Sequence, residues 1–265
     1  MRTTLIRGLA DESDRGLTAT AGPGASRDLL DFVAENKNLG RIVRLYRPTA
    51  TVAFSRRETL LDGFSEAFAE ATACGFEPVI RPAGGRAVVL DTDWFVLDVI
   101  TPEDRNQNVG HREVFADFGA RFVELFTELG IHTAVAPVNG EYCPGDFSIS
   151  ARGEVKLVGT AQRVIRGARL FSASIPFAVS SPVVELLTRV NALLELEWNP
   201  KTLGSVSSEL PTIRLSELEA ALVRTFASDI ASESSVADFL TRPSLVQIPS
   251  NLRGYHEARI AQKEA

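Results

Sequence analysis

The order of apolar segments is the feature that most constrains how this chain folds. Short segments with alternating apolar residues are typical of strands, and longer segments with apolar residues three or four positions apart are typical of helices. Here strand-like segments come in runs, and helix-like segments lie before, between and after them. This order predicts an α+β fold rather than a doubly wound parallel sheet. We expect strands at 41–47, 51–54, 77–81, 86–90, 94–100, 132–136, 147–150, 155–164 and 169–175, and helices at 26–38, 63–75, 113–129, 181–195 and 216–226.

The chain carries no internal repeat and no low-complexity linker, so we expect a single catalytic or binding domain over residues 26–230. Residues 1–25 are rich in turn formers and are expected to be peripheral. Residues 231–265 are expected to form a tail that packs on the domain or trails from it. Ser26 precedes an apolar segment with helical periodicity, and we expect its side chain to cap that helix.

Composition excludes several classes of protein. With 45% hydrophobic residues among 265 and a net charge of −6, the chain is neither disordered nor basic over its whole surface. No apolar run is long enough for a transmembrane helix. Charged residues interrupt the first residues before the apolar core of a signal peptide would form. We therefore expect a cytoplasmic protein that binds neither nucleic acid nor membrane.

The chain has two cysteines, Cys74 and Cys143, which are too few for a disulfide framework. Its three histidines lie far apart in the sequence and match no zinc-binding spacing, so we expect no metal site. Cys74 ends the segment 63–75 just before a glycine, and nothing polar nearby in sequence would activate it. We interpret Cys74 as packing at a helix end.

The first segment whose residues could form a binding or catalytic site is 81–91, with the sequence RPAGGRAVVLD. Gly84 and Gly85 lie between two expected strands, where they allow positive φ and close approach of a ligand to the backbone. Arg81 and Arg86 flank them and can pair with a carboxylate or phosphate. A glycine hairpin with solvated arginines is the simpler alternative.

Two further stretches carry a candidate nucleophile and a candidate cation. Cys143 lies in the turn EYCPGD between expected strands, where the following proline presents the thiol in a set direction, unless it is merely buried. Lys156 opens the strand KLVGTAQR, and Gly159 interrupts that strand as a close approach would require. Lys156 either faces solvent or stabilises charge that develops on an acyl carbonyl.

Together, RPAGGRAVVLD, EYCPGDFSIS and KLVGTAQRVIRGARL resemble the biotin/lipoate protein ligase superfamily. The resemblance covers about Arg41 to Ile175 and is strongest to the branch of octanoyl-transferring enzymes that act on the glycine cleavage H protein. That branch has a Gly-Gly-x-Ala-Val-Val-Leu-Asp segment and a Tyr-Cys-Pro-Gly turn that bears the nucleophile. The resemblance implies an α+β domain of the class II synthetase and biotin/lipoate ligase type, with a mixed β-sheet flanked by helices.

The resemblance also implies site residues. Cys143 matches the acyl-accepting cysteine, and Lys156 matches the strand lysine near the acyl carbonyl. The segments that line the acyl site supply Arg81, Gly84, Gly85, Arg86, Ala87, Gly159 and Thr160. Arg86 stands where ATP-using ligases have a third glycine, and Pro82 replaces an arginine. Because a side chain there enters the space where backbone would meet phosphate, we expect no tight ATP binding.

Three functions fit these features. The first is an acyltransferase that moves an octanoyl or lipoyl group through a thioester on Cys143 to a carrier lysine and needs no cofactor. Its partners would be lipoyl-carrier proteins, either the glycine cleavage H protein or the lipoyl domains of 2-oxoacid dehydrogenases. The second is an ATP- and Mg-dependent lipoate–protein ligase. The third is a non-catalytic module that binds an acyl group or a carrier.

Two surface and pocket features complete these expectations. The apolar segments 88–90 and 96–97 are expected to line a tunnel for the acyl chain. Five arginines are expected either to be solvated or to form a docking surface for an acidic carrier: Arg41, Arg44, Arg47, Arg56 and Arg57.

Overall fold

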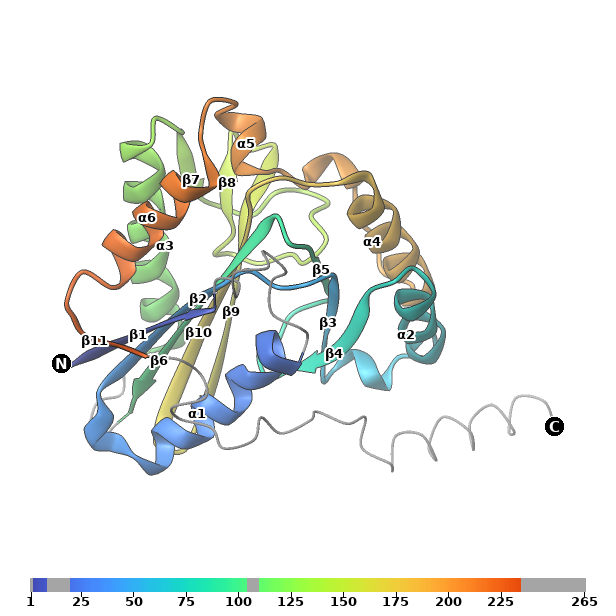
Figure 1. The fold of residues 1–265 in the computed structure, drawn as a ribbon. Coiled ribbons are helices and arrows are strands. Elements are labelled where there is room, and N and C mark those ends of the chain that lie inside the picture. Colours follow the sequence, from blue (N-terminus) through green and yellow to red (C-terminus); the bar gives the residue numbers. More distant parts are fainter. Residues whose placement is uncertain (1, 9–19, 104–109, 235–265) are drawn as a thin grey trace.

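The computed structural model describes residues 2–8, 20–103 and 110–234. Within them, eight strands form one mixed sheet in the order β11-β1-β2-β6-β10-β9-β8-β7, and three form a small sheet in the order β4-β3-β5 (Figure 1). The large sheet contains β1 (Thr3–Gly8), β2 (Arg41–Tyr46), β6 (Trp94–Pro102), β7 (Thr133–Val135), β8 (Ile149–Ala151), β9 (Val155–Ile165), β10 (Ala168–Pro176) and β11 (Ile230–Ser234). The small sheet contains β3 (Thr51–Ser55), β4 (Glu77–Arg81) and β5 (Val88–Leu90).

Six α-helices and four short helical turns complete the described part. The α-helices are α1 (Ala25–Glu35), α2 (Phe64–Ala73), α3 (His111–Glu128), α4 (Ser181–Leu193), α5 (Val206–Glu209) and α6 (Leu215–Phe226). The short turns are η1 (Thr20–Gly24), η2 (Lys37–Leu39), η3 (Glu58–Leu60) and η4 (Pro200–Thr202). Among the described residues, no helix has the length and apolar character needed to cross a membrane.

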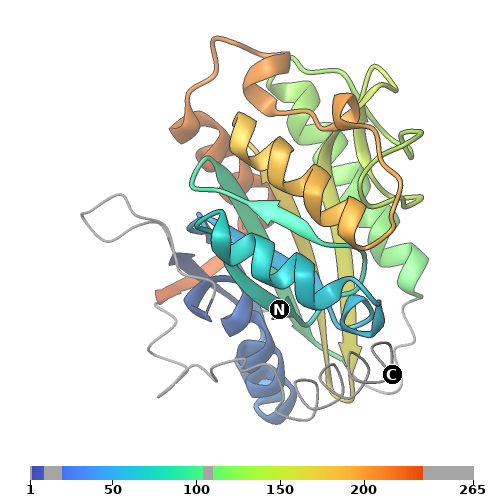
Figure 2. The same cartoon turned by 90° about the vertical axis from the view of Figure 1, so that its right-hand side faces the viewer.

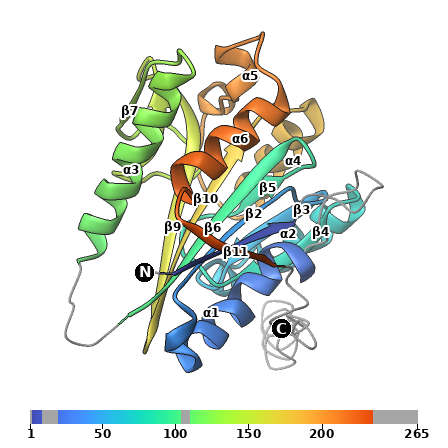
Figure 3. The same cartoon turned by 60° about the vertical axis from the view of Figure 1, so that its left-hand side comes forward.

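One face of the large sheet forms the main core. Because side chains alternate along a strand, Phe171 and Ala173 of β10 point to the same face as Leu97 of β6. The amphipathic helices α3 and α6 cover this face, with Phe118 of α3 stacked on Phe171 at 3.9 Å between ring centroids. Figures 1 and 3 show both helices on this side of the sheet.

The opposite face is shared by two structures. Helix α1 packs over Ile42, Ile100 and Leu170 at one end. The small sheet, backed by α2 and α4, covers Tyr46 and Val96 at the other end. Figure 2 shows α2 and α4 side by side on the outside of this layer. The space between α1 and the small sheet is where the candidate site lies.

The structure confirms the predicted α+β class and the mixed sheet flanked by helices. Every strand and helix expected after residue 26 is present, with bounds that shift by up to three residues. In segment 86–90, only Val88–Leu90 is a strand. The residues before it belong to a loop that contacts Cys143 instead.

Two predictions for the N-terminal part are wrong. The segment 1–25 is not peripheral as a whole, because β1 lies between β2 and β11 and pairs with both in parallel. Ser26 does not cap α1, which begins at Ala25 after Gly24. Ser26 instead points inward and donates a hydrogen bond to Asp98 at 2.6 Å. Of the expected C-terminal tail, 235–265 lies outside the described residues, whereas its first residues belong to β11.

The prediction of a basic docking surface is also wrong for Arg41, Arg44 and Arg47, the arginines of β2 and of the residue that follows it. Arg44 is fully buried and faces Asp98 at 3.5 Å, in register across β2 and β6. Arg41 pairs with Asp229, and Arg47 donates to the Thr92 carbonyl. Only the two arginines of the turn after β3, Arg56 and Arg57, are exposed. The alternating pattern of β2 therefore serves internal ion pairs rather than a partner.

Candidate active site

The turn that carries Cys143 is held by a buried carboxylate. Glu141 is fully buried, and its Oε1 accepts hydrogen bonds from the Gly145 backbone N–H and the Ser148 hydroxyl, both at 2.9 Å. A carboxylate that bridges both ends of a turn fixes the residues between them. Cys143 is one of those residues, so its thiol is presented in one direction.

The loop between β4 and β5, residues 82–87, contacts the Cys143 sulfur and is called the glycine loop below. The backbone N–H of Arg86 donates to Sγ at 3.1 Å. Gly85 has φ of +97°, and a Cβ at this position would lie 3.0 Å from Sγ and 2.9 Å from Arg81 Nη2. A side chain at Gly85 is therefore excluded both by backbone conformation and by space. The Arg86 N–H and the bare Gly85 backbone together hold Sγ in one position.

The same loop is anchored from behind by Glu58, which the sequence did not single out. Glu58 is buried in the turn after β3, and its Oε1 accepts from the Ala87 backbone N–H at 2.6 Å. Its Oε2 accepts from the backbone N–H and the hydroxyl of Ser55. From the other side, Arg81 Nη2 donates to the Arg86 carbonyl at 2.9 Å. The peptide that contacts Sγ is thus held on both flanks.

Lys156 lies beside the cysteine turn on β9. Its Nζ donates to the Cys143 backbone carbonyl at 2.8 Å and lies 3.4 Å from Glu141 Oε2 and 4.8 Å from the centre of the Tyr142 ring. Burial lowers the pKa of Lys156, while the nearby Cys143 and Glu141 charges act in the opposite direction. An ammonium has three N–H donors, so one remains to face a ligand.

Gly159 allows Tyr142 to pack against β9. A Cβ at Gly159 would lie 2.9 Å from the Tyr142 hydroxyl and 3.1 Å from Ser174 Oγ. The close approach expected at this glycine is therefore present. Burial raises the pKa of Tyr142 far above its ordinary value, so its phenol is neutral at physiological pH.

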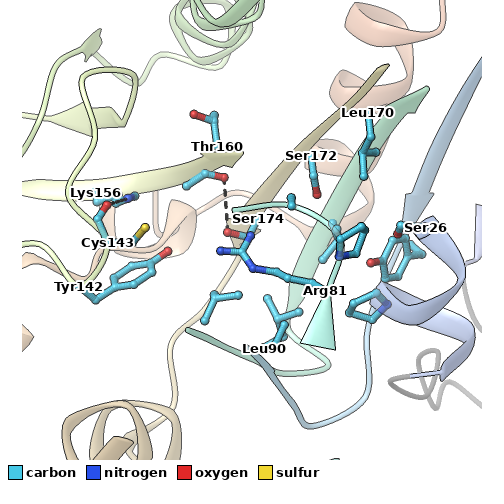
Figure 4. A pocket seen from close by; sticks show the side chains of 18 residues that line it. Ser26, Arg81, Leu90, Tyr142, Cys143, Lys156, Thr160, Leu170, Ser172 and Ser174 are labelled. Atoms are coloured by element: carbon cyan, nitrogen blue, oxygen red, sulfur yellow. Dashed lines mark hydrogen bonds between the residues drawn. The ribbon is translucent and has the colours of Figure 1, made fainter. Parts of the chain in front are cut away.

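A pocket opens from Cys143 toward α1. Its apolar wall consists of Pro23, Ala53, Pro82, Ala83, Val88, Leu90, Val96 and Leu170. Its polar lining consists of Ser26, Tyr46, Arg81, Tyr142, Cys143, Lys156, Thr160, Ser172 and Ser174, with Gly159 between strands. Figure 4 shows Cys143 and Lys156 at one end and Ser26 at the other.

Only some of the residues in segments 88–90 and 96–97, which were expected to line an acyl tunnel, line this pocket. Val88, Leu90 and Val96 line the pocket. Val89 and Leu97 do not, because alternation turns Val89 into the core of the small sheet and Leu97 toward α3 and α6.

The structure brings the predicted site residues together around Sγ. Arg81, Gly159 and Thr160 line the pocket with Cys143 and Lys156, and the Gly85–Arg86 peptide contacts the sulfur. The remaining two contribute differently: Gly84 lies on the outer side of the loop, and Ala87 anchors it through its N–H. Glu141 was visible in the sequence motif but had no assigned role, whereas Glu58 gave no sequence signal.

Cys74 lies at the end of α2 and packs partly against the small-sheet core, as expected of a cysteine at a helix end. In the fold, however, a basic side chain that is distant in sequence lies beside it. Arg189 of α4 donates to its Sγ at 3.0 Å and also pairs with Glu70. Cys74 does not line the pocket that Cys143 opens into.

Comparison with known proteins places this geometry in context. The family model of the lipoyl protein ligase A/B catalytic domain matches residues 28–227. An octanoyl-GcvH:protein N-octanoyltransferase of Exiguobacterium sp. is 30% identical over 51% of this chain and 47% of its own. The enzyme of the same name from Geobacillus kaustophilus is 29% identical over 48% of this chain and 44% of its own. The chain thus spans about half the length of these curated relatives.

Among solved structures, a lipoate-protein ligase A bound with ATP superposes with a TM-score of 0.64 at 17% identity. The match covers 97% of this chain and 94% of the ligase chain. At this identity the likeness supports the fold alone.

Proposed function

Because the chain belongs to the lipoyl protein ligase A/B catalytic domain family, we propose that it transfers an octanoyl or lipoyl group to a lysine of a carrier protein through a thioester on Cys143. The observation that carries this proposal is the placement of Cys143 Sγ. The sulfur accepts the Arg86 N–H at the open end of a pocket with an apolar wall, beside Lys156. A thiol poised at the end of a chain-shaped pocket is what covalent acyl transfer requires.

The reaction takes two steps. In the first, the Cys143 thiolate attacks the acyl carbonyl carbon of the donor, the C–S bond forms, and the bond to the donor nitrogen or sulfur breaks as that atom takes up a proton. In the second, the neutral amine of an acceptor lysine attacks the thioester carbon. The C–S bond then breaks, the thiolate returns, and the amine proton passes to solvent. Lys156 supports both steps with an N–H toward the charge that develops on the carbonyl oxygen.

The pocket wall supplies the binding energy for the chain. Each buried methylene contributes about 0.8 kcal/mol, so an eight-carbon chain gains about 5 kcal/mol before entropy costs. Ser26 lies at the end of the pocket away from Cys143, where we place the end of the acyl chain. Tyr46, whose side chain hydrogen-bonds with Ser26, also lines the pocket.

The partners proposed are lipoyl-carrier proteins, either the glycine cleavage H protein or the lipoyl domains of 2-oxoacid dehydrogenases. The names of the relatives, which include GcvH, support the first of these. We place the reaction in the cytoplasm, where such carriers and free thiols coexist.

The proposed transferase needs no cofactor, because the acyl group is already bound to the donor carrier and no free acid has to be activated. An ATP-dependent ligase is the second candidate, favoured by the match to the lipoyl protein ligase A/B catalytic domain model. Against it stands Arg86, whose side chain crosses to the Glu197 carbonyl at 3.0 Å beside the loop that a nucleotide phosphate would approach. Calorimetry separates the two, since micromolar ATP affinity enhanced by octanoate would favour the ligase.

Mass spectrometry of the intact protein tests the proposal. After incubation with an octanoyl-carrier and no ATP, we expect an added octanoyl mass on the peptide that contains Cys143. Hydroxylamine should remove it, because hydroxylamine cleaves thioesters, and the Cys143→Ser variant should not acquire it. An octanoyl carrier product formed at the normal rate by Cys143→Ser would refute the covalent route.

A further inference from the structure

A second hollow lies on the other side of Cys143 from the acyl pocket. The two share Cys143, Lys156 and Thr160, so they meet at the sulfur and at the cation beside it. Apart from these three, the second hollow is lined by Gly84, Gly85, His111, Phe115, Pro144, Gly145, Asp146, Phe147, Ser148, Ala161 and Gln162. It is formed by the glycine loop, the cysteine turn and the start of α3.

The walls of this hollow suit an alkyl chain that ends in a polar group. Phe115 and Phe147 stack with ring centroids 4.9 Å apart and nearly parallel planes, and both rings line the hollow. The opposite wall is glycine backbone, which leaves room beside the rings. His111 and Asp146 add polar groups, and both are exposed. An apolar passage with polar groups at its mouth matches the aminoalkyl arm of a lysine.

We infer that this hollow receives the lysine side chain that attacks the thioester, and that it also releases the departing group of the donor. The inference rests on the proposed function. Because Cys143 lines both spaces, an arm in the second hollow can reach the thioester carbon while the acyl chain fills the first pocket. Donor and acceptor arms then use the same passage in turn, with the stem of each arm packed against Phe147.

The hollow can be filled without disturbing the acyl pocket. Gly145 lines only the second hollow, its φ is not positive, and a Cβ there meets no atom within 4 Å. Gly145→Leu therefore places a side chain where the lysine arm would lie, while the Gly145 N–H still donates to Glu141. Gly110, just before α3, gives the matched control: its φ is also not positive, its Cβ would make ordinary contacts, and it lines neither space.

The experiment measures aminolysis of the isolated octanoyl-enzyme. The protein is acylated to completion with a small octanoyl thioester, desalted, and mixed with methylamine or n-butylamine, and loss of the acyl-enzyme is followed by intact mass. Each methylene that packs on the aromatic wall gives about a fourfold gain. We expect n-butylamine to react about tenfold faster than methylamine or more. We expect Gly145→Leu to lose at least tenfold in the n-butylamine rate, and Phe147→Ala to lose the preference for the longer amine.

The outcomes separate the inference from the proposed function. Gly110→Leu should retain the wild-type rates with both amines. Failure of wild-type protein to form any acyl-enzyme on Cys143 would overturn the proposed function and this inference with it. Normal acylation combined with unchanged n-butylamine rates in both Gly145→Leu and Phe147→Ala would overturn the inference alone, and the arm would then reach Cys143 by another route.

Discussion

Replacement of Gly85 by alanine tests how the loop holds the nucleophile. The added methyl group would lie 3.0 Å from Cys143 Sγ and 2.9 Å from Arg81 Nη2, closer than ordinary contacts of 3.4–4 Å. The backbone at Gly85, with φ of +97°, is also one that alanine rarely adopts. Either the sulfur or the loop must move, and both movements lengthen the 3.1 Å bond from the Arg86 N–H.

The size of the effect follows from that one bond. A hydrogen bond to a charged group contributes about 1.5–3 kcal/mol. If it is lost where thiolate charge must be stabilised, the rate of acylation falls about 10–100-fold, since about 1.4 kcal/mol corresponds to a factor of ten. Backbone strain at positive φ adds about 1–2 kcal/mol of lost stability. For a domain of this size that lowers Tm by about 2–8 °C.

A single-turnover measurement of Cys143 acylation provides the assay, with Gly84→Ala as the neighbouring comparison. Gly84 has no positive φ, and a Cβ there meets nothing within 4 Å, so its loss should be less than about threefold. Thermal unfolding of both variants shows whether each is folded at the assay temperature. Wild-type acylation by a folded Gly85→Ala protein would refute the role assigned to the Arg86 N–H.

Three other predictions concern the site and its support. Cys143→Ser should abolish transfer, as measured by carrier acylation, whereas Cys74→Ser should retain it, because Cys74 lies outside the pocket. Lys156→Met should slow transfer by about 10²–10³-fold. At neutral pH the variant should also be less stable, because buried Glu141 loses its cation. The penalty for burying protonated Lys156 is full below its lowered pKa and fades as the pH rises to 10.5, so urea unfolding of the variant should show a flatter rise in stability with alkaline pH than the wild type. Arg44→Met should cost about 3–5 kcal/mol in urea unfolding by leaving buried Asp98 without its cation, and Arg44→Met with Asp98→Leu should recover part of the loss.

Local patterns predicted most elements of the fold because their apolar periodicity agrees with the final packing. Helix α3, with Phe118, Phe122 and Leu125 on one face, is an example, since the same face covers the sheet. Strand β1 was missed because residues 1–25 as a whole are rich in turn formers and because its partners are distant in sequence. It pairs with β2, more than thirty residues later, and with β11 near residue 230. No local pattern encodes such pairings.

The difference between local patterns and contacts distant in sequence also explains which site residues were predicted. Cys143, Lys156 and Gly85 lie in recognisable segments, and the fold brings these segments together as the resemblance implied. Arg44 was misread because a basic residue that alternates with apolar ones is usually solvated. Its partner Asp98 lies on another strand and becomes adjacent only through the register of β2 and β6. Glu58 was missed for the same reason, since the Ala87 N–H that it binds lies 29 residues away.

Positions 85 and 86 of the glycine loop tolerate side chains differently. Arginine at 86 departs from the ligase pattern and is compatible with the contact to Cys143, whereas a side chain at 85 would not be. The contact with Sγ comes from the backbone of Arg86, and its side chain points away to the Glu197 carbonyl. Any residue with a free N–H can make that contact, so a third glycine is not required for thiolate binding. Gly85 has no such freedom, because its Cβ position is occupied by the sulfur itself and by Arg81. The proposed covalent route is therefore compatible with glycine at 85 and arginine at 86, whereas a phosphate-binding loop would favour small residues at both.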